Sequence, residues 1–195
     1  MFRHSSASGH RFMMATLGLL MVAGGSPSCE DALLFTVVST SQTEIAGSAR
    51  GIELVGLVFP ELATFDISQS KELQNQGVEP EDLESVKIAS FTLKVKSPDS
   101  IDLRFIDSIR FLAEADGLSQ VEIASYGDIT EGTREISLTL PNVELVDYVV
   151  SDSMSITTEV EARQPAEDTV LEATVTFDVQ VTPQGFCAAL DTATR

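Results

Sequence analysis

Ser68 and Lys71 have a spacing that could support nucleophilic catalysis. Residues 68–71 read SQSK and match the S-x-x-K pattern, in which a lysine one helical turn after a serine acts as its base. The rest of that serine acylase signature is missing, because residues 151–153 read SDS where SDN is needed and no KTG occurs. A helix N-cap formed by Ser68 or Ser70 explains the same residues without catalysis. A serine acylase therefore stands third among our hypotheses.

Two pairs of carboxylates could provide the acid and the base of a glycosidase. Glu114 and Asp116 form one pair, and Glu159 and Glu161 form the other. An i, i+2 spacing on a strand puts both side chains on one face, about 7 Å apart, and glycosidases use two such groups. Both pairs also fall where a solvated strand face is expected, and the chain has no tryptophan to support a sugar ring. We therefore expect no catalytic activity.

Residues 1–28 have the composition of a secretory signal peptide. The first 11 residues carry two arginines and no acidic residue, and residues 12–25 form an apolar run that ends in small residues. The run is too short to cross a bilayer, which takes roughly 20 apolar residues. His4 and His10, the two histidines of the chain, lie in this segment. The exported chain would therefore lack a Ser-His-Asp triad, a Cys-His pair and a histidine-bound zinc ion.

The composition is acidic but otherwise that of a globular protein. The chain has 12 basic and 30 acidic residues and a formal net charge of −18. Such a surface repels phosphate backbones, so we exclude nucleic acid as a partner. Hydrophobic residues make up 43% of the sequence, which is enough for a real core.

Cys29 decides whether the exported chain is anchored or free. It directly follows the small-residue region of the signal, as the acylated cysteine of a lipoprotein does, so we expect lipid attachment at Cys29. Cleavage before Ser26 would instead leave a thiol, which could form a disulfide with Cys187 in an oxidising compartment or stay free. With or without the lipid, the exported protein would reside in the periplasm, at the outer membrane or at the cell surface.

Calcium is the one cofactor that the sequence gives a reason to consider. Oxygen ligands are abundant at Asp99, Asp102 and Asp107, and again in residues 79–84. No EF-hand loop is present, and a chain this acidic forms such clusters by chance. We expect no cofactor and keep a Ca²⁺-dependent or carbohydrate-binding accessory module as the alternative.

Half of the basic residues that remain after export fall within 24 residues of one another. A stripe of this kind could recognise an acidic partner or a polysaccharide. It could also pair with acidic residues on neighbouring strands, which we favour. The five residues are Lys87, Lys94, Lys96, Arg104 and Arg110.

The hydrophobic period along most of the chain is two, which is typical of strands with one buried face. Residues 154–162 and 171–181 alternate most clearly, and the turn-like stretch at 163–168 between them predicts a long antiparallel hairpin. Shorter alternating runs predict strands around residues 91–95, 109–113, 121–123 and 136–140. Further strands are predicted at 33–45, in parts of 52–59 and at 64–68.

The strands and turns together predict one all-β domain over residues 29–195. Frequent turn residues between short strands favour an immunoglobulin-like antiparallel β-sandwich of about 7–9 strands. Residues 69–85 interrupt the pattern with two cap-like starts, SKELQNQ and EPEDLESV, and predict one short helical excursion.

The succession FDIS, a polar helical stretch, a strand closing at KSPDS, and then FIDSIRFLAEADGL resembles small uncharacterised envelope lipoproteins of bacteria with a single β-sandwich domain. The resemblance covers roughly residues 64–118. It implies export and a sandwich fold, and it transfers no active-site residue. We therefore expect an exported cell-envelope module that binds a protein or polysaccharide of the envelope or has a structural role there.

Overall fold

The computed structural model describes residues 33–151 and 153–182, and the clearest alternating stretch of the sequence lies at its centre. Strand β7 (Thr169–Val181) alternates between buried and half-buried residues along its whole length. It pairs antiparallel with β1 (Leu33–Ile45) on one side and with β2 (Leu83–Ser97) on the other. Strand β5 (Glu135–Ser137) continues beyond β2, which gives a four-stranded sheet in the order β1-β7-β2-β5.

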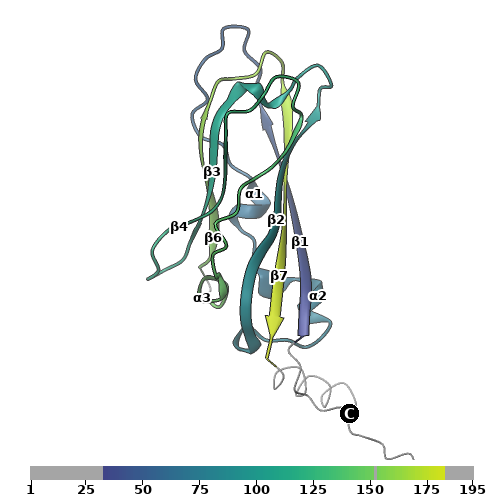
Figure 1. The fold of residues 1–195 in the computed structure, drawn as a ribbon, viewed down its shortest axis with the longest axis vertical. Coiled ribbons are helices and arrows are strands. Elements are labelled where there is room, and N and C mark those ends of the chain that lie inside the picture. Colours follow the sequence, from purple (N-terminus) through teal and green to yellow (C-terminus); the bar gives the residue numbers. More distant parts are fainter. Residues whose placement is uncertain (1–32, 152, 183–195) are drawn as a thin grey trace, which may run out of the picture.

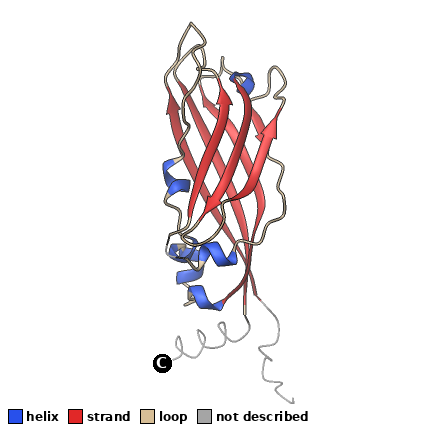
Figure 2. Ribbon diagram, turned by 90° about the vertical axis from the view of Figure 1, so that its left-hand side faces the viewer, coloured by secondary structure: helices blue, strands red, loops and turns tan. Residues whose placement is uncertain are grey.

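A second antiparallel sheet packs against the first, as Figures 1 and 2 show. Its order is β4 (Val121–Gly127), β3 (Ile106–Glu114) and β6 (Ser155–Ala162). The inward-facing residues of both sheets form one core, because period-two alternation points every second side chain to the same face. Its largest fully buried side chains include Phe59, Phe91, Phe111 and Phe177. The predicted all-β sandwich is confirmed.

The helical segments are short, and most of them lie between β1 and β2. They are α1 (Pro60–Ala63), η1 (Ile67–Gln69), α2 (Lys71–Gln74) and η2 (Pro80–Asp82), with η3 (Leu103–Phe105) and α3 (Val146–Val149) further on. The predicted helical excursion is confirmed, although its last residues belong to β2. The strand predicted at 64–68 was wrong. This segment is a loop and a 3-10 turn whose apolar side chains still reach the core, since Ile67 is buried and Phe65 stacks on Phe177.

The order of the strands is that of a jelly roll. Residues 52–54 border β6 through a single antiparallel bridge between Glu53 and Arg163. With this edge included, the strand order of the second sheet is 52–54, β6, β3, β4. In the first sheet the last strand of the chain, β7, lies between β1 and β2. In an immunoglobulin constant domain the first and second strands are neighbours. The sandwich therefore has a double Greek key order that differs from the immunoglobulin-like one expected.

The hairpin predicted from residues 154–162 and 171–181 was wrong. Strand β6 pairs with β3, whereas β7 pairs with β1 and β2 in the other sheet. The connection at 163–168 therefore crosses from one sheet to the other. Alternation reports which side of a strand is buried, and in a sandwich both sheets bury their inner side, so the pattern is the same for neighbours and for facing strands.

The two ends of the sandwich differ in what they carry. Strand β1 begins where β7 ends, because Leu33 pairs with Val181. The loops at 46–52, 98–105, 128–134 and 163–168 gather at the opposite end, here called the distal end (Figure 1). Backbone hydrogen bonds join these loops to one another: Ser48 donates to Pro165 at 2.7 Å, Gln164 to Ile52 at 2.7 Å and Leu103 to Thr133 at 2.8 Å.

Candidate functional site

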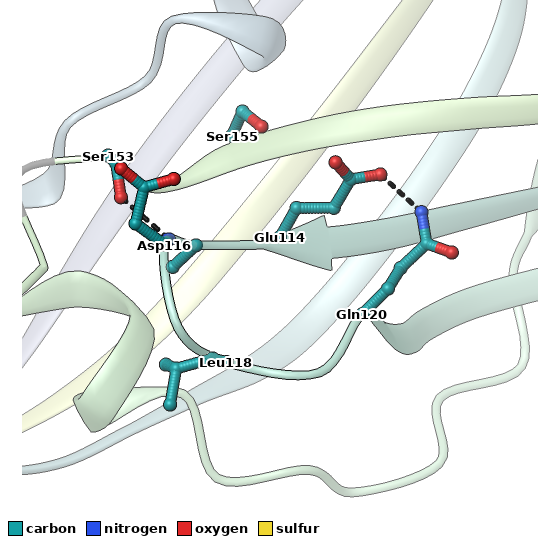
Figure 3. Close-up of a pocket in the computed structure, with 7 residues that line it drawn as sticks. Glu114, Asp116, Leu118, Gln120, Ser153 and Ser155 are labelled. Carbon is teal, nitrogen blue, oxygen red and sulfur yellow. Dashed lines mark hydrogen bonds between the residues drawn. The ribbon is translucent and has the colours of Figure 1, made fainter.

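A hollow of about 420 Å³ lies where β3 ends, beside the start of β6. Its lining includes Glu114 and Asp116, the carboxylates that the sequence placed on one strand face, together with Ser153 and Ser155 (Figure 3). Strand β3 ends at Glu114, however, so Asp116 belongs to the following turn. The sequence therefore identified two residues of a real hollow but gave them the wrong geometry.

The two carboxylates of this hollow do not face each other as an acid and a base. Glu114 accepts hydrogen bonds from the Thr157 hydroxyl at 3.0 Å and from the side-chain amide of Gln120. Asp116 lies on the other side, where its backbone N–H donates to the Ser153 hydroxyl at 2.8 Å (Figure 3). Glu114 is thus held by neutral donors of its own sheet and turn. This arrangement fixes the β3–β4 turn and leaves a polar, open hollow.

The second pair of carboxylates lies on the solvated face of β6. Glu159 forms an ion pair with Arg110 of β3, and Glu161 accepts a hydrogen bond from Ser108 at 3.2 Å. Both are cross-strand contacts between exposed side chains. They agree with the non-catalytic interpretation of the sequence, in which both glutamates lie on a solvated strand face.

The structure places Ser68 and Lys71 in different elements. Ser68 belongs to η1 and Lys71 begins α2. Ser70 is the N-cap of α2, and its hydroxyl accepts a hydrogen bond from the N–H of Leu73 at 3.4 Å. The serine and lysine of the S-x-x-K pattern therefore do not share the helical turn on which the acylase pattern depends.

The aspartates proposed as calcium ligands have separate positions. Asp99 pairs with Arg134 at 3.1 Å, and Asp107 is exposed on β3. Asp102 accepts hydrogen bonds from the N–H groups of Arg104 at 3.1 Å and Gly132 at 2.7 Å. Within residues 33–151 and 153–182, no three acidic, histidine or cysteine side chains are grouped so as to hold a metal ion.

The hydrogen bonds of Asp102 act on its charge as well as on its position. The N–H of Gly132 is the main cause that lowers the pKa of Asp102, and the N–H of Arg104 and its guanidinium add to this effect against the opposing effect of burial. The ionised carboxylate therefore joins η3 to the loop at 128–134, and its role here is to connect two distal loops.

The basic residues of the 87–110 stretch pair mostly across strands and turns. Lys94 contacts Glu135 at 2.9 Å, and Lys96 contacts Glu172 at 3.2 Å. Arg104 contacts Glu131 at 2.9 Å, and Arg110 contacts Glu159. Lys87 lies opposite Asp178 in the β2–β7 register. The pairing that we favoured over a basic stripe is confirmed for these four ion pairs.

Sequence reasoning missed two arginines and one glutamate that connect or border loops. Arg134 donates to the carbonyl oxygens of Pro98 at 3.1 Å and Val95 at 3.3 Å. Glu144 holds the segment before α3 against β2. Arg163 directly follows β6 at the distal end. It is the single basic residue in the sequence of 153–182, and this isolation is the signal that could have identified it.

Several predictions fall on residues outside the described part of the chain. These are the signal peptide at 1–28, the lipid attachment at Cys29 and the disulfide between Cys29 and Cys187. In the part that the structure describes, no helix has the length and apolar character needed to cross a membrane.

Comparison with known proteins gives a limited result. No protein-family model and no curated protein matches the sequence. Among solved structures, the chain is similar to the BFDV capsid protein in its decameric form, with 11% identity, a TM-score of 0.41, and coverage of 77% of this chain and 99% of the other. The 60-mer form of the BFDV capsid protein gives 11% identity, a TM-score of 0.38, and coverage of 80% and 95%.

Proposed function

We propose that this chain is an exported, non-catalytic module of the cell envelope that binds a partner or has a structural role there, and that a lipid on Cys29 anchors it. The leader-like composition of residues 1–28 and the cysteine that directly follows them support export and anchoring. The partner is a protein or polysaccharide of the envelope.

The observation that carries the proposal is the position of the strand ends. Cys29 lies four residues before Leu33, where β1 begins, and the distal loops lie at the other end of the 13-residue β1. At about 3.3 Å per strand residue, β1 separates the two ends by roughly 40 Å. A lipid on Cys29 would therefore hold the near end at the bilayer and present the distal loops away from it.

The residues considered for catalysis also support a non-catalytic role. Glu114, Glu159 and Glu161 form hydrogen bonds or ion pairs within their own sheet. The distal loops, in contrast, are joined into one surface by backbone hydrogen bonds, by Asp102 and by Arg134. A rigid set of loops on a β scaffold is a common site of binding.

Fractionation tests this proposal when the full chain is expressed with its own leader in a bacterium that has an outer membrane. The native protein and Cys187→Ser should be found in membranes, and Cys29→Ser in the soluble fraction. The intact mass of the membrane form should equal the chain from Cys29 onward plus diacylglycerol and acyl groups. A cleaved chain with an unmodified Cys29, a mass lower by two hydrogens, or an uncleaved leader would each contradict the lipid anchor.

A further inference from the structure

The distal end contains a hollow of about 260 Å³ that brings together two arginines in an acidic protein. Arg104 of η3 and Arg163 at the end of β6 both line it. Its other lining residues include the apolar side chains of Ile101, Phe105 and Pro165. The volume lies just below the range of about 300–1,000 Å³ that is typical of small-molecule sites, so the hollow suits a small ligand.

Backbone contacts hold the walls of this hollow in place. The N–H of Arg163 donates to the carbonyl of Phe105 at 2.8 Å, which connects its two arginine-bearing segments directly. The N–H of Gln164 donates to the carbonyl of Ile52 at 2.7 Å, and Pro165 is buried. The arginines therefore extend from a backbone that the sandwich fixes before any ligand arrives, which lowers the entropy lost on binding.

The two guanidinium groups have little to hold them elsewhere. Among residues 33–151 and 153–182, no side chain forms an ion pair or a hydrogen bond with the guanidinium of Arg163. Arg104 pairs with Glu131, but the two side chains are 58% and 78% exposed, and such a pair contributes little because water and salt screen it. An entering anion can replace Glu131 at small cost.

The acidic residue of the hollow is already engaged. Asp102 lines the same surface, but its two carboxylate oxygens accept hydrogen bonds from the backbone N–H groups of Arg104 and Gly132. Its position is therefore held by donors of the loops themselves. Its negative charge offsets part of the positive charge of the neighbouring Arg104, and the two guanidinium groups of Arg104 and Arg163 still give the hollow one positive charge more than Asp102 takes away.

We propose that this hollow binds a small organic carboxylate with an apolar body, whose carboxylate contacts Arg104 and Arg163 and whose body packs on Ile101 and Phe105. Guanidinium groups match the planar geometry of a carboxylate and bind it through two parallel hydrogen bonds. The apolar lining favours a carboxylate on a hydrocarbon group over a free inorganic anion. This ligand is additional to the envelope protein or polysaccharide of the proposed function, and the inference does not depend on that function.

The test is an NMR titration of the ¹⁵N-labelled exported chain with 3-phenylpropionate at constant ionic strength. The amide signals of Arg104, Phe105, Arg163 and Gln164 should shift and saturate. Neutral 3-phenylpropionamide should bind at least tenfold more weakly, and inorganic phosphate should not produce the same saturable shifts. Equal binding of the amide, equal binding of phosphate, or the absence of saturation would overturn the proposal.

Matched arginine variants locate the ligand. Arg104→Gln and Arg163→Gln should each weaken binding at least tenfold, whereas Arg110→Gln, which removes an arginine with an exposed ion pair on the sheet, should not. If Arg163→Gln does not fold, Arg104→Gln and the amide control decide the question. Loss of membrane anchoring in the fractionation with intact titration behaviour would contradict the proposed function alone. Normal anchoring without saturable shifts would contradict this inference alone.

Discussion

The carboxylate of Glu144 accepts a hydrogen bond from the backbone N–H of Val86 at 2.6 Å. The same side chain accepts a hydrogen bond from the Ser85 hydroxyl at 2.6 Å, and the N–H of Leu145 donates to the carbonyl of Val86 at 2.8 Å. These contacts join the segment before α3 to the first half of β2. They take the place of the regular β-sheet hydrogen bonds with β2 that a longer β5 would form.

Glu144→Ala should lower the free energy of unfolding by about 1–3 kcal/mol, because it leaves several donors without their charged acceptor. Urea unfolding followed by circular dichroism measures this change. Glu81→Gln, which changes an exposed glutamate of η2, is the control and should stay within about 0.5 kcal/mol of the native protein. Equal effects of both variants would contradict the role given to Glu144.

The stability of the native protein should also depend on pH through Glu144. Burial alone raises its pKa, but the hydrogen bonds from Ser85 and three backbone N–H groups outweigh burial and hold the pKa below its ordinary value. This stabilisation is complete above the unfolded-state pKa of about 4.3 and is lost as the pH falls through the lower folded-state pKa. Native protein should therefore lose more stability below about pH 4 than Glu144→Gln does, as urea titrations at several pH values would show.

The alternation of the sequence was enough to predict much of the fold. Residues 33–45 were expected to form a strand and form β1 over the same residues, and the alternation from Leu171 to Val181 lies within β7. The same signal could not assign strands to sheets, so the partners of β6 were wrong. It also misled at 64–68, where Phe65 and Ile67 alternate as in a strand but reach the core from a loop and a 3-10 turn.

The candidate sites were harder to predict than the strands, for a physical reason. Glu114 and Asp116 are neighbours in sequence, so their shared location could be expected. Arg104 and Arg163 are brought together by the antiparallel pairing of β3 with β6, in which Ile106 lies opposite Ala162, and no local pattern encodes which strands pair. Long-range placement of this kind depends on the strand order of the whole sandwich.

Phe111 is a core residue whose truncation should destabilise the protein strongly. It is fully buried, and its ring lies 4.3 Å from that of Phe91 and 5.6 Å from that of Phe59. Phe111→Ala should lower the free energy of unfolding by about 3–5 kcal/mol, and Phe111→Leu by less. Leu118→Ala, at a partly exposed position in a turn, should cost much less in the same urea measurement. A cost of Phe111→Ala below about 1 kcal/mol would mean that this aromatic cluster is not in the core.

Calcium should stabilise the protein no more than sodium does at equal ionic strength. The oxygens of Asp102 are occupied by backbone donors, and Asp99 pairs with Arg134. Both salts then act by screening the negative net charge. Thermal unfolding in millimolar CaCl₂ and in NaCl of matched ionic strength should give the same melting temperature. A larger increase in calcium that disappears in Asp102→Asn would instead support the calcium-dependent alternative.

The last prediction concerns Gly47, which the distal end needs for space and not for its backbone angles. Its N–H donates to the Asp168 carboxylate at 2.8 Å, and a Cβ at this position would lie 2.6 Å from the backbone nitrogen of Asp168. Gly47→Ala must therefore displace the loop at 163–168, and overpacking of this kind costs about 1–3 kcal/mol.

The matched control for Gly47→Ala is a glycine with the opposite requirement. Gly117 has a φ of +78° and open space around its Cβ position, so Gly117→Ala should cost about 1–2 kcal/mol through backbone conformation alone. Urea unfolding measures both losses, and amide hydrogen exchange separates them. Exchange should increase at 46–52 and 163–168 in Gly47→Ala, and at the turn near 117 in the control. If Gly47→Ala left exchange at the distal loops unchanged, the close packing of this glycine against the loop at 163–168 would be refuted, because the added Cβ would then have displaced no backbone there.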